Sequence, residues 1–167
     1  LDLWMAGENY CRYQFYQAAK EADLIIVEGA MGMFDGNPSS ADLAATFNIP
    51  MAIVMDVKAM AQTAAIMAMG LANHRSDVKV AGLIANSCST ERHRQLIEEA
   101  LPESLPLLAT LPKSESIALP ERHLGLVQAS EVRDELEQRF EAGADWLVAA
   151  GLENILQRFD NVEFKPS

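Results

Sequence analysis

Basic side chains and cysteines are scarce in this sequence. Lys and Arg number 13 against 24 Asp and Glu, which gives a formal net charge of −11. Binding to nucleic acid needs a basic surface that neutralises phosphates, so this balance argues against nucleic acid as a partner. The two cysteines, Cys11 and Cys88, match no metal-binding spacing. We expect both to be reduced thiols in a cytoplasmic protein.

The sequence also has no uninterrupted apolar run of membrane-spanning length. The candidate, Met51–Gly70, is broken by Asp56, Lys58 and Gln62, so a strand followed by a buried helix is the better interpretation. Neither Gly-x-x-x-x-Gly-Lys-Ser/Thr nor Gly-x-Gly-x-x-Gly occurs in the chain. The first residue is Leu1 rather than methionine, and we expect the chain to be a fragment of a longer protein.

Short apolar runs alternate with segments of helical periodicity along the whole chain. Strands are expected at Leu24–Val27, Pro50–Met55, Val78–Ala85 and Leu107–Leu111. Helices are expected at Gly7–Ala22, from a cap at Ser39 or Ser40 through Phe47, at Met60–Ala72, from a cap at Ser89 through Leu101, and as two helices within Ser130–Phe159 with a break near Gly143. This alternation is typical of βαβ units. We predict an α/β fold, a parallel sheet with helices on both faces, in one domain over residues 1–167.

A polar residue follows each predicted strand. These residues are Glu28, Asp56, Asn86, and Pro112 with Lys113. Ligands of open parallel sheets bind beyond the carboxyl ends of the strands, so the set predicts a binding site along one edge. The alternative is that strand ends are polar because they reach water. Two roles remain as alternatives for Asp56: it orients a ligand, or it caps the helix Met60–Ala72.

Glu28 comes directly after four apolar residues, so we expect a partly desolvated carboxylate that needs a cation. Mg²⁺ bound to nucleotide phosphates suits such a hard oxygen ligand. The alternative is a carboxylate that accepts local backbone N–H groups. Gly29, Gly32 and Gly36 allow close backbone approach and leave N–H groups for a phosphate, although their spacing alone is a weak signal.

Three segments carry a family resemblance. Glu28–Gly36 reads Glu-Gly-Ala-Met-Gly-Met-Phe-Asp-Gly and resembles the Glu-Gly-Val-Met-Gly-Leu-Phe/Tyr-Asp-Gly segment of cobyrinate a,c-diamide synthases, including their hydrogenobyrinate and Ni-sirohydrochlorin relatives. Leu119–Val127 is similar to the family motif Leu-Pro-x-Arg-His-Leu-Gly-Leu, and Leu1–Met5 to Asn-Leu-Asp-x-Trp-Met. Ala30 and Met33 replace the commoner valine and leucine, and Ser87 stands where arginine is often found.

The resemblance implies a dethiobiotin-synthetase-like P-loop NTPase domain, incomplete at its N-terminus and without its Walker A region. It implies ATP-dependent amidation of the a and c carboxylates of a corrinoid or related tetrapyrrole, with Mg²⁺ and ATP. ATP phosphorylates the carboxylate, and ammonia released from glutamine by a glutaminase domain, which these residues do not include, displaces the phosphate. The fragment alone is expected to have little or no activity. A homodimer is a further expectation.

The resemblance also implies roles for single residues. Glu28 matches the Mg²⁺–ATP carboxylate, and Asp35 matches an acid that serves substrate or intermediate binding. Asn86 stands where related domains recognise adenine, while Gly29, Gly32 and Pro112 are further nucleotide contacts. Arg122 and His123 are expected near the substrate or a domain interface, and a surface cation is the alternative for Arg122. Other enzymes of this nucleotide-domain class, such as cobyric acid synthase or dethiobiotin synthetase, and a non-catalytic binding or scaffold remnant are the alternatives.

Overall fold

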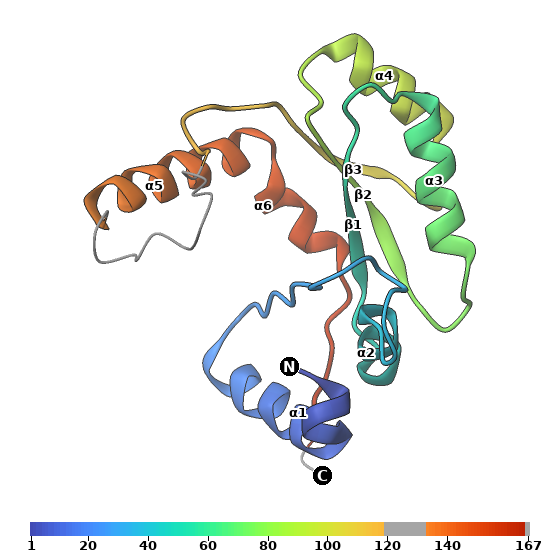
Figure 1. Cartoon of the computed structure of the whole chain (residues 1–167), viewed down its shortest axis with the longest axis vertical. Coiled ribbons are helices and arrows are strands. Elements are labelled where there is room, and N and C mark those ends of the chain that lie inside the picture. Colours follow the sequence, from blue (N-terminus) through green and yellow to red (C-terminus); the bar gives the residue numbers. More distant parts are fainter. Residues whose placement is uncertain (119–132, 166–167) are drawn as a thin grey trace.

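A three-stranded parallel sheet lies at the centre of the computed structural model, which describes residues 1–118 and 133–165 (Figure 1). The elements are α1 Leu3–Glu21, α2 Ser40–Phe47, β1 Met51–Asp56, α3 Gln62–Asn73, β2 Val80–Asn86, α4 Glu91–Ala100, β3 Leu107–Leu111, α5 Arg133–Ala149, α6 Leu152–Ile155 and the 3₁₀ turn η1 Leu156–Arg158. The strand order is β1-β2-β3, and both pairs are parallel. The predicted α/β class with a parallel sheet is confirmed.

Apolar side chains alternate between the two faces of the sheet, as the period of two in a strand requires. Ile53 and Leu83 point to the face that α3 and α4 cover, where they pack with Ala64, Ala68 and Ile97. The opposite face carries Ile84, Ala109 and Leu111, which pack with Ile155 and Trp146 of the α5–α6 layer. Helices therefore cover both faces, and the strands present their carboxyl ends to the loops above them (Figure 1).

Gly82 allows β2 to approach β3 closely. A Cβ atom at this position would lie 2.5 Å from the carbonyl oxygen of Pro106 and 2.6 Å from Cγ of Leu108. The register between the two strands shifts at Leu83, next to the glycine. Any side chain at residue 82 would push the strands apart.

Side chains cap the starts of α2 and α4. Ser39 caps α2, and Asp42 completes the capping box by accepting from the Ser39 backbone N–H. Of the two caps predicted for this helix, Ser39 and Ser40, the structure has Ser39. The predicted cap of α4 at Ser89 is wrong, because the Thr90 hydroxyl accepts the hydrogen bond from the His93 N–H at 3.2 Å. Ser89 instead accepts from the backbone N–H of Lys113.

The predicted strand Leu24–Val27 is absent from the sheet. This segment is extended, and Leu24 and Ile26 are 50% and 82% exposed, while Ile25 packs against the cluster of Cys11 and Phe15. Apolar sequence favours a buried strand, but a strand also needs a hydrogen-bonded neighbour. No described strand pairs with this segment, and that lack of a neighbour accounts for the wrong prediction.

The predicted break near Gly143 is also wrong. α5 runs through Gly143, and the chain turns instead at Gly151, which has a φ of 76° and separates α5 from α6. A helix interior tolerates glycine at a modest cost, whereas a left-handed residue ends it. In the part of the chain that the structure describes, the helices are too short or too polar to span a bilayer.

Candidate functional site

Three of the predicted site positions meet at the carboxyl edge of the sheet. Asp56 is in register with Asn86, and Asn86 with Leu111, directly before Pro112. The loops beyond are held together by backbone hydrogen bonds from Val57 N–H to the Asn86 carbonyl at 2.9 Å and from Cys88 N–H to the Leu111 carbonyl at 3.0 Å. The sequence prediction that these residues gather at one edge is confirmed for Asp56, Asn86 and Pro112.

Two residues of this edge have left-handed backbone conformations that non-glycine residues rarely adopt. Ala59 has a φ of 60° and Ser87 a φ of 61°. Each such residue costs about 1–3 kcal/mol, and such strain is concentrated at ligand-binding sites. Both loops leave their strands at the carboxyl edge, where a phosphate or an adenine base would be bound in a fold of this kind. A third left-handed residue, Asn48, is the C-cap of α2, so this feature is not confined to the edge.

Asp56 is held as a carboxylate. Its Oδ1 accepts from the backbone N–H of Lys58 at 2.9 Å, and this bond, with a second from the Ser87 side chain, lowers the pKa of Asp56. The capping alternative for Asp56 is wrong, because α3 begins after Ala61 without a side-chain cap. Nearby, burial raises the pKa of the Cys88 thiol, so this cysteine stays neutral.

Two side chains that the sequence did not single out support the edge. The Nε2 atom of His93 contacts the carbonyl of Met60 and joins α4 to the loop after β1. Trp146 on α5 donates from Nε1 to the Pro112 carbonyl at 3.0 Å. The two contacts span 33 and 34 residues, so both depend on the fold and neither had a local sequence signal.

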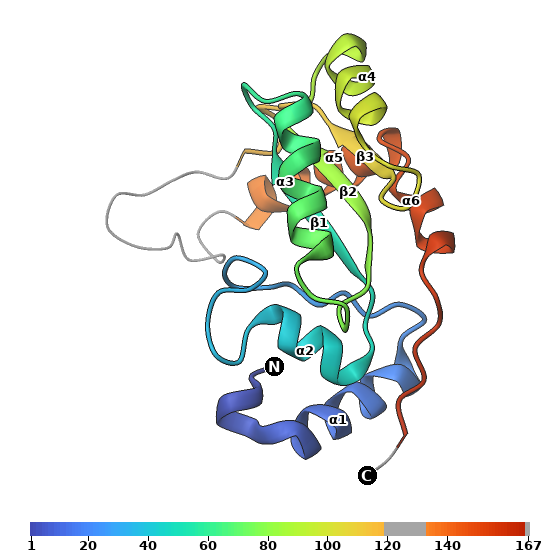
Figure 2. The same cartoon turned by 90° about the vertical axis from the view of Figure 1, so that its right-hand side faces the viewer.

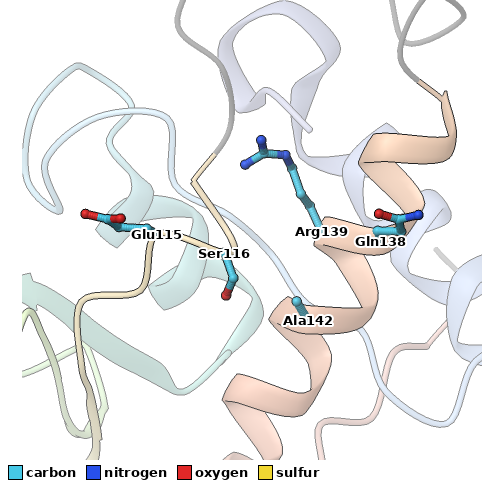
Figure 3. A pocket seen from close by; sticks show the side chains of 5 residues that line it. All are labelled: Glu115, Ser116, Gln138, Arg139 and Ala142. Atoms are coloured by element: carbon cyan, nitrogen blue, oxygen red, sulfur yellow. The ribbon is translucent and has the colours of Figure 1, made fainter.

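A hollow of about 400 Å³ lies between the loop after β3 and α5 (Figure 3). Glu115 and Ser116 line it from the loop, and Gln138, Arg139 and Ala142 line it from the helix. Arg139 also donates to the Ala118 carbonyl, which ties the two walls together. Four of the five lining residues, all but Ala142, are polar or charged. Arg122 and His123 lie outside the described residues.

The loop Glu28–Gly36 lies at the other end of α3. A Cβ on Gly29 would be 2.8 Å from the Ser40 hydroxyl, and the Phe34 ring stacks edge-on against His74, with 4.6 Å between centroids. His74 follows the last residue of α3, a helix of 12 residues. At 1.5 Å per residue, about 18 Å of helix separates this loop from the start of α3, beside the carboxyl edge. The expectation that Glu28 joins Asp56 and Asn86 is wrong for this conformation.

The position of Glu28 follows from the lack of a pairing partner for Leu24–Val27 among the described strands. Glu28 would reach the carboxyl edge only as the last residue of a strand parallel to β1, and Leu24–Val27 does not pair. The carboxylate of Glu28 is exposed instead of desolvated. Asp35 is exposed too; its N–H donates to the Gly32 carbonyl at 3.0 Å, and its carboxylate fills the space where a Cβ on Gly32 would clash. The Asp35 side chain is exposed and can move aside, so this contact alone does not require glycine at residue 32.

The Glu28 loop could hold Mg²⁺ only through a single carboxylate together with a bound nucleotide. Among residues 1–118 and 133–165, no three His, Cys, Asp or Glu side chains converge on a common point. Mg²⁺, however, is commonly held by one or two carboxylates together with substrate phosphates and water. Exposed Glu28 suits that arrangement as a single ligand, and the nucleotide would provide the rest.

A parallel sheet covered by helices, with its loops gathered at the carboxyl edge, is the architecture of the α/β class, whose ligands bind at that edge. A sequence-family model described as an AAA domain matches residues 6–121, and the chain belongs to this family. No solved structure matches the chain.

Curated relatives extend the comparison. The chain is 48% identical over 147 residues to a hydrogenobyrinate a,c-diamide synthase of Stutzerimonas stutzeri. The aligned region covers 88% of the chain and 34% of the relative. It is 47% identical over 150 residues to the enzyme of the same name from Pseudomonas aeruginosa, covering 90% and 34%. A cobyrinate a,c-diamide synthase of Herminiimonas arsenicoxydans is 46% identical over 132 residues, covering 79% and 30%. The predicted resemblance is confirmed, and the chain spans about a third of the length of these relatives.

Proposed function

We propose that the protein to which these residues belong is a cytoplasmic ligase that amidates the a and c carboxylates of cobyrinate or a related tetrapyrrole. ATP phosphorylates each carboxylate, and ammonia derived from glutamine displaces the phosphate. The observation that carries the proposal is the 48% identity over 88% of the chain to a hydrogenobyrinate a,c-diamide synthase. The nucleotide-binding fold and the strained carboxyl edge agree with it.

The proposed reaction needs no covalent bond between the substrate and the protein. A carboxylate is a poor electrophile, and phosphorylation gives it a leaving group. The protein must therefore position the two reactants and stabilise charge on the transferring phosphoryl group. Mg²⁺, when bound with ATP, supplies most of that positive charge. In a chain with a net charge of −11, a cation and local backbone N–H groups are the natural means of holding triphosphate.

The described residues divide these tasks between two regions. At the carboxyl edge, the Asn86 amide donates to and accepts from the edge of adenine, and Pro112 borders the base. In the loop, Glu28 holds Mg²⁺, Gly29 and Gly32 offer backbone N–H groups to the phosphates, and Asp35 binds the substrate or the acyl phosphate. Arg122 and His123 act beside the substrate. The Walker A and glutaminase functions come from parts of the protein outside residues 1–167.

One ATP molecule unites the two regions if Leu24–Val27 becomes a strand parallel to β1. Glu28 would then stand at the same edge as Asp56 and Asn86, because carboxyl ends of parallel strands share an edge. The exposure of Leu24 and Ile26 supports this arrangement, since pairing beside a covered sheet would remove both side chains from water. We propose that this pairing accompanies assembly of the complete nucleotide site.

The experiment is the substitution Glu28→Gln in the full-length protein, with amidation of cobyrinate measured in the presence of ATP, Mg²⁺ and glutamine. Turnover should fall about 100-fold or more, the usual cost of removing a group that organises transition-state charge. Glu103→Gln removes another exposed acid, away from the loop, and should leave turnover unchanged. Unchanged turnover in Glu28→Gln would refute the magnesium role, and wild-type protein inert towards cobyrinate would refute the activity.

A second experiment concerns residues 1–167 alone. We expect them to bind Mg-ATP poorly, because their sequence contains no Gly-x-x-x-x-Gly-Lys-Ser/Thr loop to hold the phosphates. Isothermal titration calorimetry measures this directly. Micromolar binding would contradict the expectation and show that the described loops form a sufficient nucleotide site.

A further inference from the structure

One face of α5 is partly buried and the other is exposed. The partly buried residues recur at the spacing of one side of a helix, and they are Leu136, Arg139, Ala142, Gly143, Trp146 and Leu147. Trp146 and Leu147 pack with Ile155 against the face of the sheet that carries Ile84. Figures 1 and 2 show α5 on the opposite side of the sheet from α3. The C-terminal end of this face is therefore anchored on the sheet.

Two hydrogen bonds join this face of α5 to residues 112–118, the segment that follows β3. At the start of the segment, the Pro112 carbonyl accepts from Nε1 of Trp146 at 3.0 Å. At its end, the Ala118 carbonyl accepts from the Arg139 guanidinium. Positions 139 and 146 are about two helical turns apart, which is about 10 Å along the helix axis. The 112–118 segment therefore runs antiparallel to α5 along this face.

Small residues of α5 face the 112–118 segment between these two hydrogen bonds. Ala142 lines the hollow together with Glu115 and Ser116 of the segment (Figure 3). A Cβ on Gly143 would lie 3.9 Å from Cγ2 of Ile117, which is an ordinary van der Waals contact. The segment therefore contacts the same helix face at its start, in its middle and at its end.

The 112–118 segment also contacts the chain that follows β2. The backbone N–H of Lys113 donates to the Ser89 hydroxyl at 3.4 Å. Asn86, the last residue of β2, is in register with Leu111, and Leu111 directly precedes Pro112. The position of Pro112 is therefore set by two elements, by α5 and by the strand that carries Asn86.

We propose that Trp146 and Arg139 are positioning residues for nucleotide binding, because they hold the 112–118 segment on α5 and keep Pro112 beside the adenine base. The inference rests on the proposed function, which puts the base beside Asn86 and Pro112. Proline has no N–H to donate, so its ring contributes packing alone. A gap of about 0.5–1 Å already loses about a quarter to a half of such an attraction. The groups proposed to hold the phosphates are elsewhere, so release of the segment should weaken binding of the base and not of the phosphates.

The test compares Mg-ATP with Mg-tripolyphosphate, which has the phosphates without the base, in isothermal titration calorimetry of the full-length protein. Trp146→Phe keeps the aromatic packing and removes the Nε1 donor. It should raise the Kd for Mg-ATP about three- to tenfold, the usual effect of one lost hydrogen bond, and leave the Kd for Mg-tripolyphosphate unchanged. The KM for ATP should rise by the same factor with little change in kcat. Phe140→Leu, at a 60% exposed residue on the other face of α5, is the control and should change neither Kd.

Arg139→Met is the second variant, because it removes the donor to Ala118 and keeps the aliphatic packing of a partly exposed side chain. It should raise the Kd for Mg-ATP about threefold or more, again without an effect on Mg-tripolyphosphate. Circular dichroism verifies that each variant is folded. An equal loss of affinity for both ligands, or unchanged affinity for Mg-ATP in both variants, would overturn the inference.

Asn86→Ala, measured alongside, separates this inference from the proposed function. If Asn86→Ala weakens Mg-ATP binding and the two α5 variants do not, the positioning role is wrong and the adenine site stands. If none of the three variants weakens it, the proposed adenine site is wrong, and the inference falls with it. Wild-type protein that binds Mg-ATP but is inert towards cobyrinate would refute the proposed activity alone, because both Kd values are measured without turnover.

Discussion

Asp42 links the start of α2 to the end of α3, and its charge should account for a measurable part of the stability. Its Oδ2 accepts from the Ser39 backbone N–H at 2.7 Å and from the Ser39 hydroxyl at 2.9 Å, while Oδ1 accepts from Arg75 at 2.5 Å. Arg75 also forms a two-bond ion pair with Asp77. The Ser39 N–H and the Arg75 guanidinium lower the pKa of Asp42 from 3.8 to about 2.

The size of the effect follows from the pKa. A lowering from 3.8 to about 2 corresponds to about 2.5 kcal/mol at about 1.4 kcal/mol per unit. The Asp42 side chain is 34% exposed, so solvent screening reduces this to about 1 kcal/mol. Because the folded-state pKa is the lower one, the contribution is complete above pH 4 and disappears as the pH falls towards 2.

Urea unfolding of Asp42→Asn against wild type, followed by circular dichroism, measures this contribution. At pH 7 the variant should be less stable by about 1 kcal/mol, and the difference should shrink towards zero between pH 4 and pH 2, where wild-type Asp42 becomes protonated. Glu103→Gln, in an exposed loop, serves as the control. A difference that stays constant down to pH 2, or that is absent at pH 7, would refute the assignment.

The remaining predictions concern the sheet and its carboxyl edge. Gly82→Ala should destabilise the chain by about 3 kcal/mol or more in urea unfolding, because its Cβ meets the Pro106 carbonyl oxygen; an effect below 1 kcal/mol would contradict the close approach. Gly143→Ala inside α5, where the nearest atom is 3.9 Å away, should be neutral or slightly stabilising. In the full-length enzyme, Asn86→Ala should raise the KM for ATP about tenfold with little change in kcat, whereas Asn73→Ala should not; an unaltered KM would argue against adenine recognition.

Local sequence signals located most elements well. The Ser39–Asp42 spacing predicted the capping box of α2, and apolar runs predicted β1, β2 and β3 within two residues of their observed ends. Polar residues after these runs predicted the Asp56–Asn86–Pro112 edge. Each of these predictions depends on interactions between residues close in sequence, or on the general rule that carboxyl ends of parallel strands coincide.

The family, too, could be predicted from sequence, because Glu28–Gly36 and Leu119–Val127 are long motifs in a fixed order. The amino-acid composition argued against a nucleic-acid partner through the net charge of −11.

Only the tertiary structure decided where the Glu28 loop lies. Its apolar lead-in, Leu24–Val27, has the composition of a buried strand, but pairing depends on whether a neighbouring strand is available, and composition carries no information about that. The same holds for the Trp146–Pro112 contact and for the exposure of α3, which depend on segments far apart in the chain. Sequence determined the elements and the chemistry of the loops, whereas long-range pairing decided which of those loops share a site.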